Sequence, residues 1–283
     1  MPRPEDLPGT DVLTIEDQEI PVRDGAKIGI RIYKPKSVQP QAPLVFVTHG
    51  GGWVIGVHGA EETMNKYIAG RNGAVVISVD YRMAPEFKFP YAVNDSLDAL
   101  KWCIENADTL GIDKNRIILA GSSAGGNLAF ILSQIALDEK INGIVGVIAG
   151  NPVTCHPAFF PKAHFELDSF ETNADAPGLN KERMMWFWDL YVPDPQPDTL
   201  HSPLLAESLS GLPPALILIA GVDPLRDEGI AYADRLKEAG VPVQLEIYSG
   251  VPHGWHNITI LSKAKKYHDD IRVFVDKTFA SKL

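Results

Sequence analysis

Continuous apolar runs that alternate with helical stretches restrict this sequence to a layered α/β arrangement. From Pro43 onward each run ends at glycine or at charged residues, and none shows polar alternation. A run of this kind is typical of a strand buried on both faces, which belongs to a parallel sheet covered by helices. The runs lie at Leu44–Val47, Ala74–Val79, Arg116–Ala120, Gly143–Ala149, Ala215–Ala220 and Val243–Tyr248.

The N-terminal strands and the intervening helices complete this pattern. Apolar and polar residues alternate in Val12–Ile15, Glu19–Val22 and Ile28–Tyr33, which predicts an antiparallel opening. We therefore predict an α/β fold: a mostly parallel, doubly wound sheet with antiparallel N-terminal strands. The expected helices are Ala60–Arg71, Ala92–Asn106, Ala124–Leu137, Lys181–Tyr191, Glu228–Ala239 and Ser262–Phe279.

One segment interrupts the alternation of strands and helices. Residues 152–214 lack a clean strand and carry many prolines around one aromatic helix. We interpret residues 152–203 as a small helical cap inserted above the sheet, and we expect a short N-terminal segment, residues 1–24, to join it. With 45% apolar residues, the chain of 283 residues is expected to form a single domain over 1–283.

Charge and apolar content exclude several functions. A formal net charge of -10 opposes binding to nucleic acid. No apolar stretch has the roughly 18 to 20 residues of a membrane-spanning helix, so we expect no membrane span. The two cysteines, Cys103 and Cys155, are too few for a disulfide framework.

The two ends of the chain bear on location. Prolines and acids fill residues 1–8, where a signal peptide needs positive charge and then an apolar run, so secretion is not expected. The last residues are Ser281-Lys282-Leu283, the address of peroxisomal proteins. We expect a peroxisomal location in a eukaryote, and a cytoplasmic one otherwise.

A G-x-S-x-G pattern marks a candidate nucleophile. The strand Arg116–Ala120 runs into Gly121-Ser122-Ser123-Ala124-Gly125, and a helix follows at once. Glycines on both sides permit a sharp turn that exposes the central serine beside the N-terminus of a helix. Ser123 is therefore the candidate nucleophile, and Ser122 lies one residue too early.

A serine nucleophile needs a base that is oriented by a carboxylate, in the chain order serine, acid, histidine. Asp223 follows the strand Ala215–Ala220, with Asp227 as a rival that is typical of a helix N-cap. His253 follows the last strand, with His256 as a competitor. A metal pair of the two histidines lacks a third ligand with zinc-like spacing, so no metal is expected.

These motifs together resemble the hormone-sensitive-lipase-like family of α/β-hydrolase esterases. The resemblance covers most of the chain. It implies a triad of Ser123, Asp223 and His253, and an oxyanion hole from Gly50, Gly51 and Ala124. The motifs that carry it are His49-Gly50-Gly51-Gly52-Trp53, Asp80 to Glu86, Gly121 to Asn127, Asp223 to Gly229, and His253-Gly254.

The chain departs from the family at the residue before the nucleophile. Members commonly have aspartate there, where this chain has Ser122, and they often have a longer N-terminal cap. We therefore expect an open pocket, covered mainly by the insertion and able to accept bulky acid or alcohol groups. Its expected lining includes Trp53, Ser122, Trp186 and Trp255.

The predicted function is serine-dependent hydrolysis of short- to medium-chain or bulky small-molecule carboxylic esters, without cofactor or metal. The resemblance also suggests a homodimer. Two alternatives keep the nucleophile: an acyltransferase or another tailoring enzyme of secondary metabolism, and a lyase. A third is a non-catalytic receptor, which the retained His253 disfavours.

Overall fold

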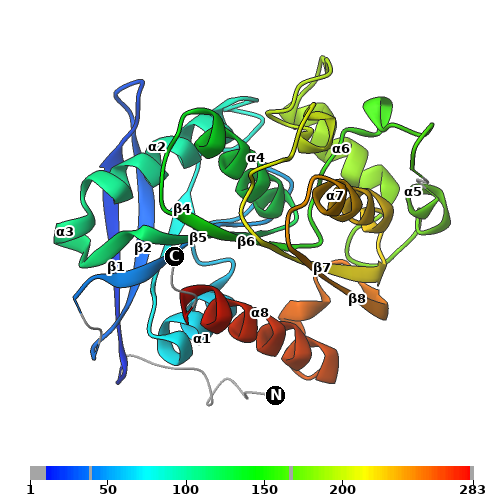
Figure 1. Cartoon of the computed structure of the whole chain (residues 1–283). Helices are drawn as coiled ribbons and strands as arrows, with labels where there is room; N and C mark the ends of the chain where they lie inside the picture. Colours follow the sequence, from blue (N-terminus) through cyan, green and yellow to red (C-terminus); the bar gives the residue numbers. More distant parts are fainter. Residues whose placement is uncertain (1–10, 38–39, 166–167, 281–283) are drawn as a thin grey trace.

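A computed structural model describes residues 11–37, 40–165 and 168–280, and its centre is one eight-stranded sheet. The strands lie side by side in the order β1-β2-β4-β3-β5-β6-β7-β8 (Figure 1). Their bounds are β1 Leu13–Pro21, β2 Lys27–Pro35, β3 Ala42–Thr48, β4 Val75–Asp80, β5 Ile112–Ser122, β6 Ile144–Gly150, β7 Ala215–Val222 and β8 Val243–Pro252.

Strand direction confirms the predicted fold class. β1 pairs with β2 and β2 with β4 in antiparallel fashion, whereas β3 through β8 pair in parallel. The two short strands predicted at 12–15 and 19–22 form one continuous strand, β1. Its register with β2 runs unbroken from the pair Leu13 and Pro35 to the pair Pro21 and Lys27, so the acidic residues between them belong to the strand.

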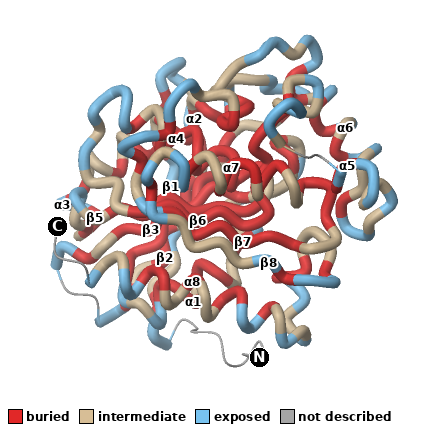
Figure 2. Tube along the Cα trace, turned by 45° about the vertical axis from the view of Figure 1, so that its right-hand side comes forward, coloured by how far each residue is buried: buried red, intermediate tan, exposed pale blue. Residues whose placement is uncertain are grey.

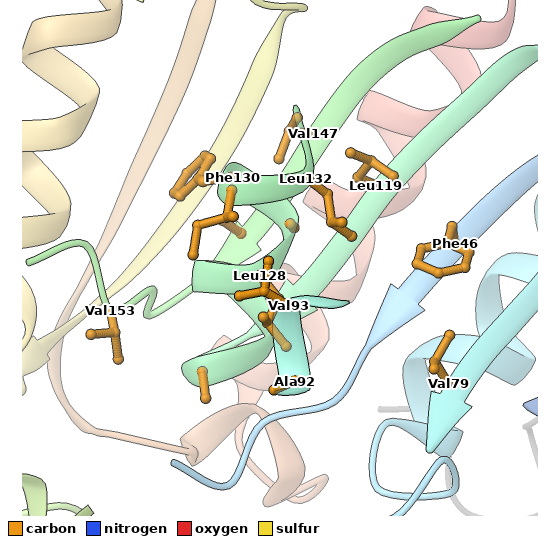
Figure 3. Packing of buried hydrophobic residues seen from close by; sticks show 14 of the residues in the cluster. Phe46, Val79, Ala92, Val93, Leu119, Leu128, Phe130, Leu132, Val147 and Val153 are labelled. Carbon is orange, nitrogen blue, oxygen red and sulfur yellow. The ribbon is translucent and has the colours of Figure 1, made fainter. Parts of the chain in front are cut away.

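Side chains of the central strands point alternately into two cores, one on each face of the sheet. In β3, Leu44 and Phe46 join the larger core, and Val45 and Val47 join the smaller one. Figure 3 shows Phe46 among residues of the larger core, and Figure 2 shows how buried the central strands are. This burial on both faces explains their continuous apolar sequences.

Helices cover both faces. The helices α1 and α8 pack together on the smaller core, and α2, α4 and α7 lie on the opposite face (Figure 1). The predicted helices are all present, with ends shifted by a few residues. Their bounds are α1 Glu62–Asn72, α2 Tyr91–Glu105, α3 Ala107–Leu110, α4 Ala124–Asp138, α5 Ser169–Thr172, α6 Lys181–Tyr191, α7 Arg226–Glu238 and α8 Ser262–Ala280.

The segment between β6 and β7 has the helical character that its sequence predicts. It contains α5, α6 and two short 3₁₀ helices, η2 (Pro157–Phe159) and η3 (Pro203–Leu205). Of the N-terminal segment 1–24, the part that the structure describes does not join it. Residues 13–21 pair in the sheet as β1, at the end opposite to α5 and α6 (Figure 1), while residues 1–10 lie outside the described part.

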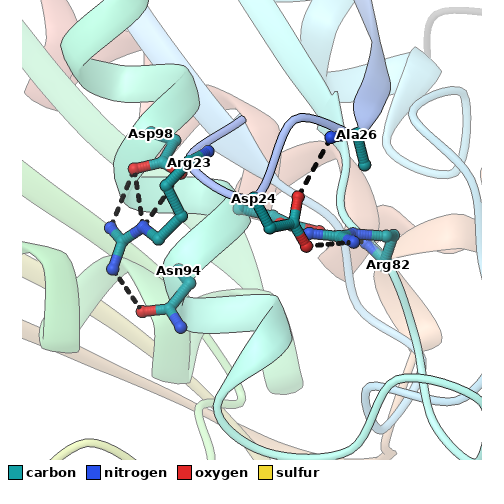
Figure 4. A network of polar contacts seen from close by, with 7 residues as sticks. Arg23, Asp24, Ala26, Arg82, Asn94 and Asp98 are labelled. Carbon is teal, nitrogen blue, oxygen red and sulfur yellow. Dashed lines mark hydrogen bonds and ion pairs between the residues drawn. The ribbon is translucent and has the colours of Figure 1, made fainter. Parts of the chain in front are cut away.

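Two arginines fasten the turn between β1 and β2 to the rest of the fold (Figure 4). Arg23 contacts both carboxylate oxygens of Asp98 on α2, the shortest contact being 2.8 Å. Arg82 lies 2.8 Å from Asp24 in the turn and 2.7 Å from the buried Asp95. These planar, forked contacts hold the loop after β4, which continues into the site described next.

Candidate active site

Ser123 lies at the sharp turn between β5 and α4. Its φ is +55° and its ψ is -121°, a backbone conformation that non-glycine residues rarely adopt. The Ser123 amide donates to the Gly150 carbonyl at 2.7 Å, which anchors the turn to β6. This turn presents the serine at the carboxyl edge of the sheet, where α4 begins.

The flanking glycines are needed because the turn is crowded. A Cβ at Gly121 would lie 2.4 Å from the carbonyl of Gly125, and one at Gly125 would lie 2.0 Å from the Thr48 carbonyl oxygen. Real Cβ atoms do not approach backbone so closely, so both positions exclude any side chain. The Thr48 hydroxyl also donates to the Gly125 carbonyl at 2.8 Å. The spacing G-x-S-x-G thus follows from packing at the strand end.

His253 and Asp223 form a hydrogen-bonded pair across two neighbouring strand ends. His253 Nδ1 lies 2.7 Å from Asp223 Oδ2, and the Leu225 amide donates to the other carboxylate oxygen at 2.9 Å. The Asp223 side chain is 1% exposed and that of His253 is 15% exposed. No hydrogen bond of the described residues joins the Ser123 hydroxyl to His253, but both residues line the same cavity.

The two rival residues have different surroundings. Asp227 does not cap α7, which begins at Arg226. Its carboxylate accepts from the Ser169 amide at 2.7 Å and lies 2.7 Å from Arg226. His256 is buried, and burial lowers its pKa to about 3. Of these candidate acids and histidines, Asp223 and His253 are the two that contact each other.

His49 holds the glycine-rich loop after β3. Its Nδ1 lies 2.7 Å from the Gly50 carbonyl oxygen, and its ring stacks on Tyr81 with centroids 4.2 Å apart. The Tyr81 hydroxyl donates to the His49 carbonyl at 2.8 Å. Burial lowers the pKa of His49, which favours the neutral ring. The segment that begins at Asp80 thereby braces the loop.

The amide of Gly50 interacts with the carboxyl of Glu61, a residue 5% exposed that precedes α1, and lowers the pKa of that acid. No hydrogen bond between described residues uses the amide of Gly51 or of Gly52. The amide of Ala124, as the first residue of α4, has no partner four residues back in the helix.

A cavity of about 310 Å³ lies above Ser123 and His253. The insertion supplies much of its wall, as the sequence predicts, through residues at 178–187. A Cβ at Gly52 would lie 2.3 Å from the Phe187 ring, so α6 packs directly on the glycine-rich loop. The apolar lining consists of Ile55, Ala60, Leu179, Met184 and Phe187.

Only one of the four predicted pocket residues lines the cavity. Ser122 lines the cavity, but the three tryptophans do not. Trp53 is buried against Tyr191, with ring centroids 4.5 Å apart, and Trp255 is buried in the smaller core. Trp186 lies on the outer face of α6 and is 49% exposed. The expectation for the tryptophans was wrong because aromatic sequence alone does not say which face of a helix or loop meets the cavity.

Glu61 is the cavity residue that the sequence does not reveal. It lies in the acidic pair Glu61-Glu62 just before α1, where acids commonly favour a helix N-terminus. Nothing in that pattern distinguishes the buried acid from its neighbour, which contacts Lys66 at 3.0 Å. Burial raises the pKa of the Glu61 carboxyl.

The described residues contain no group of three or more His, Cys, Asp or Glu side chains placed to hold a metal ion. Among the helices of the described ranges, none is long and apolar enough to cross a bilayer.

Comparison with known proteins identifies the family of this chain. The profile of the α/β hydrolase fold family matches residues 45–257. Carboxylesterase NlhH of Mycobacterium tuberculosis is 38% identical over 89% of this chain and 78% of its own length. Ethyl acetate hydrolase of Pseudomonas putida is 38% identical over 84% of this chain and 74% of its own length.

Solved structures agree with the sequence matches. The crystal structure of vibralactone cyclase superposes with a TM-score of 0.92 at 34% identity, over 98% of this chain and 83% of that one. Since the fold, the family profile and the esterase relatives coincide, the chain belongs to the hormone-sensitive-lipase-like family of α/β hydrolases and is a carboxylesterase-type hydrolase.

Proposed function

We propose that this carboxylic ester hydrolase uses Ser123 as nucleophile, His253 as general base and acid, and Asp223 to orient His253. The observation that carries the proposal is the 2.7 Å contact of His253 with Asp223, on the wall of the cavity that also exposes the strained Ser123. The Nδ1 bond leaves the opposite ring nitrogen, Nε2, to exchange a proton with the serine.

In the proposed reaction, Nε2 of His253 takes the Ser123 proton as the serine oxygen attacks the ester carbonyl carbon. The tetrahedral intermediate collapses, and the alcohol leaves with the proton held by His253. Water then repeats the sequence on the acyl-enzyme: His253 takes a proton from water, the acid is released, and the proton returns to Ser123. Asp223 stabilises the charged imidazole in both halves.

The oxyanion requires backbone donors that have no other acceptor. The amides of Gly51 and Ala124 meet this requirement, in line with the sequence prediction. The Gly50 amide interacts with the Glu61 carboxyl, which disfavours it as a third donor. We therefore assign that role to Gly52, whose amide makes no hydrogen bond with the described residues.

The cavity favours small esters. Its volume of about 310 Å³ is at the lower end of small-molecule sites, and its apolar lining suits a short to medium acyl chain. The triad chemistry needs neither metal nor cofactor.

The test is hydrolysis of p-nitrophenyl acetate, butyrate, octanoate and laurate by the wild type and Ser123→Ala. We expect activity on the shorter esters and a loss of about 10⁵- to 10⁶-fold in kcat for the variant. Wild-type activity in Ser123→Ala would refute the assignment.

A second candidate is transfer of the acyl group to a hydroxyl instead of water. The observation that favours it is the close structural match with a protein titled vibralactone cyclase. Either acceptor can attack the same acyl-enzyme after losing a proton to His253. Product analysis with an added small alcohol, and with hydroxy esters that can close a ring, distinguishes the two. Hydrolysis converts the acyl group to the free acid, whereas transfer gives a new ester or a cyclic ester.

Location and assembly are proposed on separate grounds. The C-terminal Ser281-Lys282-Leu283 lies outside the described residues, and in a eukaryotic host it would direct the protein to peroxisomes. A fluorescent fusion with and without the tripeptide tests this.

We also propose a homodimer through the edge strand β8, where Ile247 is 50% exposed. Light scattering of Ile247→Lys against the wild type tests that interface.

A further inference from the structure

Glu61 is a buried acid in the wall of the reaction cavity, without a role in the proposed proton transfers. It is 5% exposed and enters the cavity beside Ser122 and Ser123. Its carboxyl oxygen lies 3.9 Å from His256 Nε2, a ring whose own pKa burial lowers to about 3. A buried acid with no cationic partner is costly unless hydrogen bonds satisfy it.

The polar groups near Glu61 belong to two segments: the glycine-rich loop after β3 and the turn between β5 and α4. The Gly50 amide and the Ser122 hydroxyl both interact with its carboxyl and lower its pKa, and all three residues line the same cavity. Gly50 directly precedes Gly51, one of the proposed oxyanion donors. Ser122 directly precedes Ser123. A single side chain thus joins the residues that come immediately before a donor and before the nucleophile.

The same two segments are in close backbone contact. A Cβ at Gly50 would lie 2.9 Å from the Ser122 carbonyl oxygen, so the glycine-rich loop rests on the serine turn. Behind them the Tyr267 hydroxyl lies 3.4 Å from Ser122 Oγ, which closes a buried polar network against α8.

We propose that Glu61 is a positioning residue that holds the oxyanion loop in register with Ser123 through polar contacts with Gly50 and Ser122. This rests on the proposed function, because it explains how the donors and the nucleophile keep a fixed separation. A displacement of about 1 Å between such groups is enough to cost about 100-fold in rate.

The protonation state of Glu61 determines which substitutions test the proposal. Burial raises the pKa of Glu61, which favours the neutral acid, with one oxygen that accepts and one hydroxyl that donates. Glutamine has the same shape and the same two functions. Methionine has a similar length and neither function.

The experiment compares Glu61→Gln, Glu61→Met and the neighbouring surface control Glu62→Gln. The measurements are kcat and KM for p-nitrophenyl butyrate, Tm, and the inhibition constant of a trifluoromethyl ketone. Ser123 adds reversibly to that ketone, and its proton passes to His253, so the adduct oxygen occupies the oxyanion position. Such a ligand reports the geometry of the transition state rather than that of the substrate.

We expect Glu61→Met to lose about 100-fold in kcat, with the ketone's inhibition constant rising by a similar factor and KM changing by about threefold or less. Glu61→Gln and Glu62→Gln should stay within about threefold of the wild type in all three. A purely structural role would lower Tm without this split between KM and kcat.

Two results would overturn the proposal: unchanged kcat and ketone affinity in Glu61→Met, or a loss in Glu61→Gln as large as that in Glu61→Met. If Glu61→Met does not fold, Ser122→Ala takes its place, because it removes one of the two polar contacts of Glu61. It should lose about 10-fold in kcat, and no loss would contradict the proposed link between the two segments. Failure of the proposed function is distinct, since the wild type itself would then lack Ser123-dependent hydrolysis.

Discussion

Two histidines three residues apart, just after β8, both line the cavity but have different partners. His253 contacts Asp223 at 2.7 Å, whereas His256 is buried, stacks on Tyr267 with centroids 4.7 Å apart, and has an Nδ1 without a partner among the described residues. The aspartates of the β7 loop divide in the same way, because Asp227 contacts Arg226 and Ser169 instead of a histidine. Residue type alone is therefore a poor guide to function, since the orienting partner decides.

The largest expected effect separates the histidines. His253→Ala should lose about 10⁵- to 10⁶-fold in kcat on p-nitrophenyl butyrate, because it removes the base that takes the Ser123 proton in the proposed mechanism. His256→Gln should lose at most about tenfold. Steady-state kinetics on both variants decides the matter, and a larger loss in His256→Gln would reverse the assignment.

The next effect separates the aspartates. Asp223→Asn should lower kcat by about 10⁴-fold, since the amide favours the wrong tautomer of His253 and does not stabilise the imidazolium. Asp227→Asn should remain within about tenfold, with its main effect on Tm. Equal losses in the two variants would show that the contact of Asp223 with His253 is not the decisive one.

A smaller effect concerns stability and pH. Burial lowers the pKa of His256 to about 3 and that of His268 to about 4, both below the unfolded value near 6.5. Because the unfolded chain binds more protons, the stability contributed by each neutral ring is present above pH 6.5 and is lost as pH falls toward the folded pKa. The loss is about 1.4 kcal/mol per pH unit and ring.

The measurement is Tm at pH 7.5, 6 and 5. Tm should fall across this range in the wild type and fall less steeply in His256→Gln. His164→Gln, at an exposed loop position, serves as the control and should keep the wild-type slope. An unchanged slope in His256→Gln would show that this ring does not drive the acid sensitivity.

The smallest effect compares two aromatic residues of α6. Phe187 lines the cavity and Trp186 does not. Phe187→Ala should alter kcat/KM most for the longer esters, whereas Trp186→Ala should change it by about twofold or less for every chain length. A selective loss in Trp186→Ala would place that side chain at the substrate.

The sequence predicts the fold well where burial of an element produces a recognisable pattern of apolar residues. Strands buried on both faces have continuous apolar runs, and the helix 181–191 is found at its predicted bounds. The short helices α3 and α5 span too few residues to give a periodic signal. The acidic residues inside β1 make one strand look like two short strands in the sequence. They are compatible with a single strand because an edge strand tolerates polar residues on its exposed face.

The candidate site is less evenly predictable. Chain order and strand ends are enough to nominate Ser123, Asp223 and His253 as residues that converge. They do not reveal Glu61, which is buried in the cavity wall with Ser122, far from it in sequence. The tryptophans fail for the same reason, since long-range packing and not sequence composition selects which side chains face the cavity.

The most direct test of the central assignment distinguishes two adjacent serines. Intact-protein and peptide mass spectrometry after reaction with a fluorophosphonate would be applied to the wild type, Ser122→Ala and Ser123→Ala. We predict one covalent adduct, located on Ser123, in the wild type and in Ser122→Ala, and none in Ser123→Ala. An adduct on Ser123→Ala, or an unlabelled wild type, would contradict Ser123 as the nucleophile.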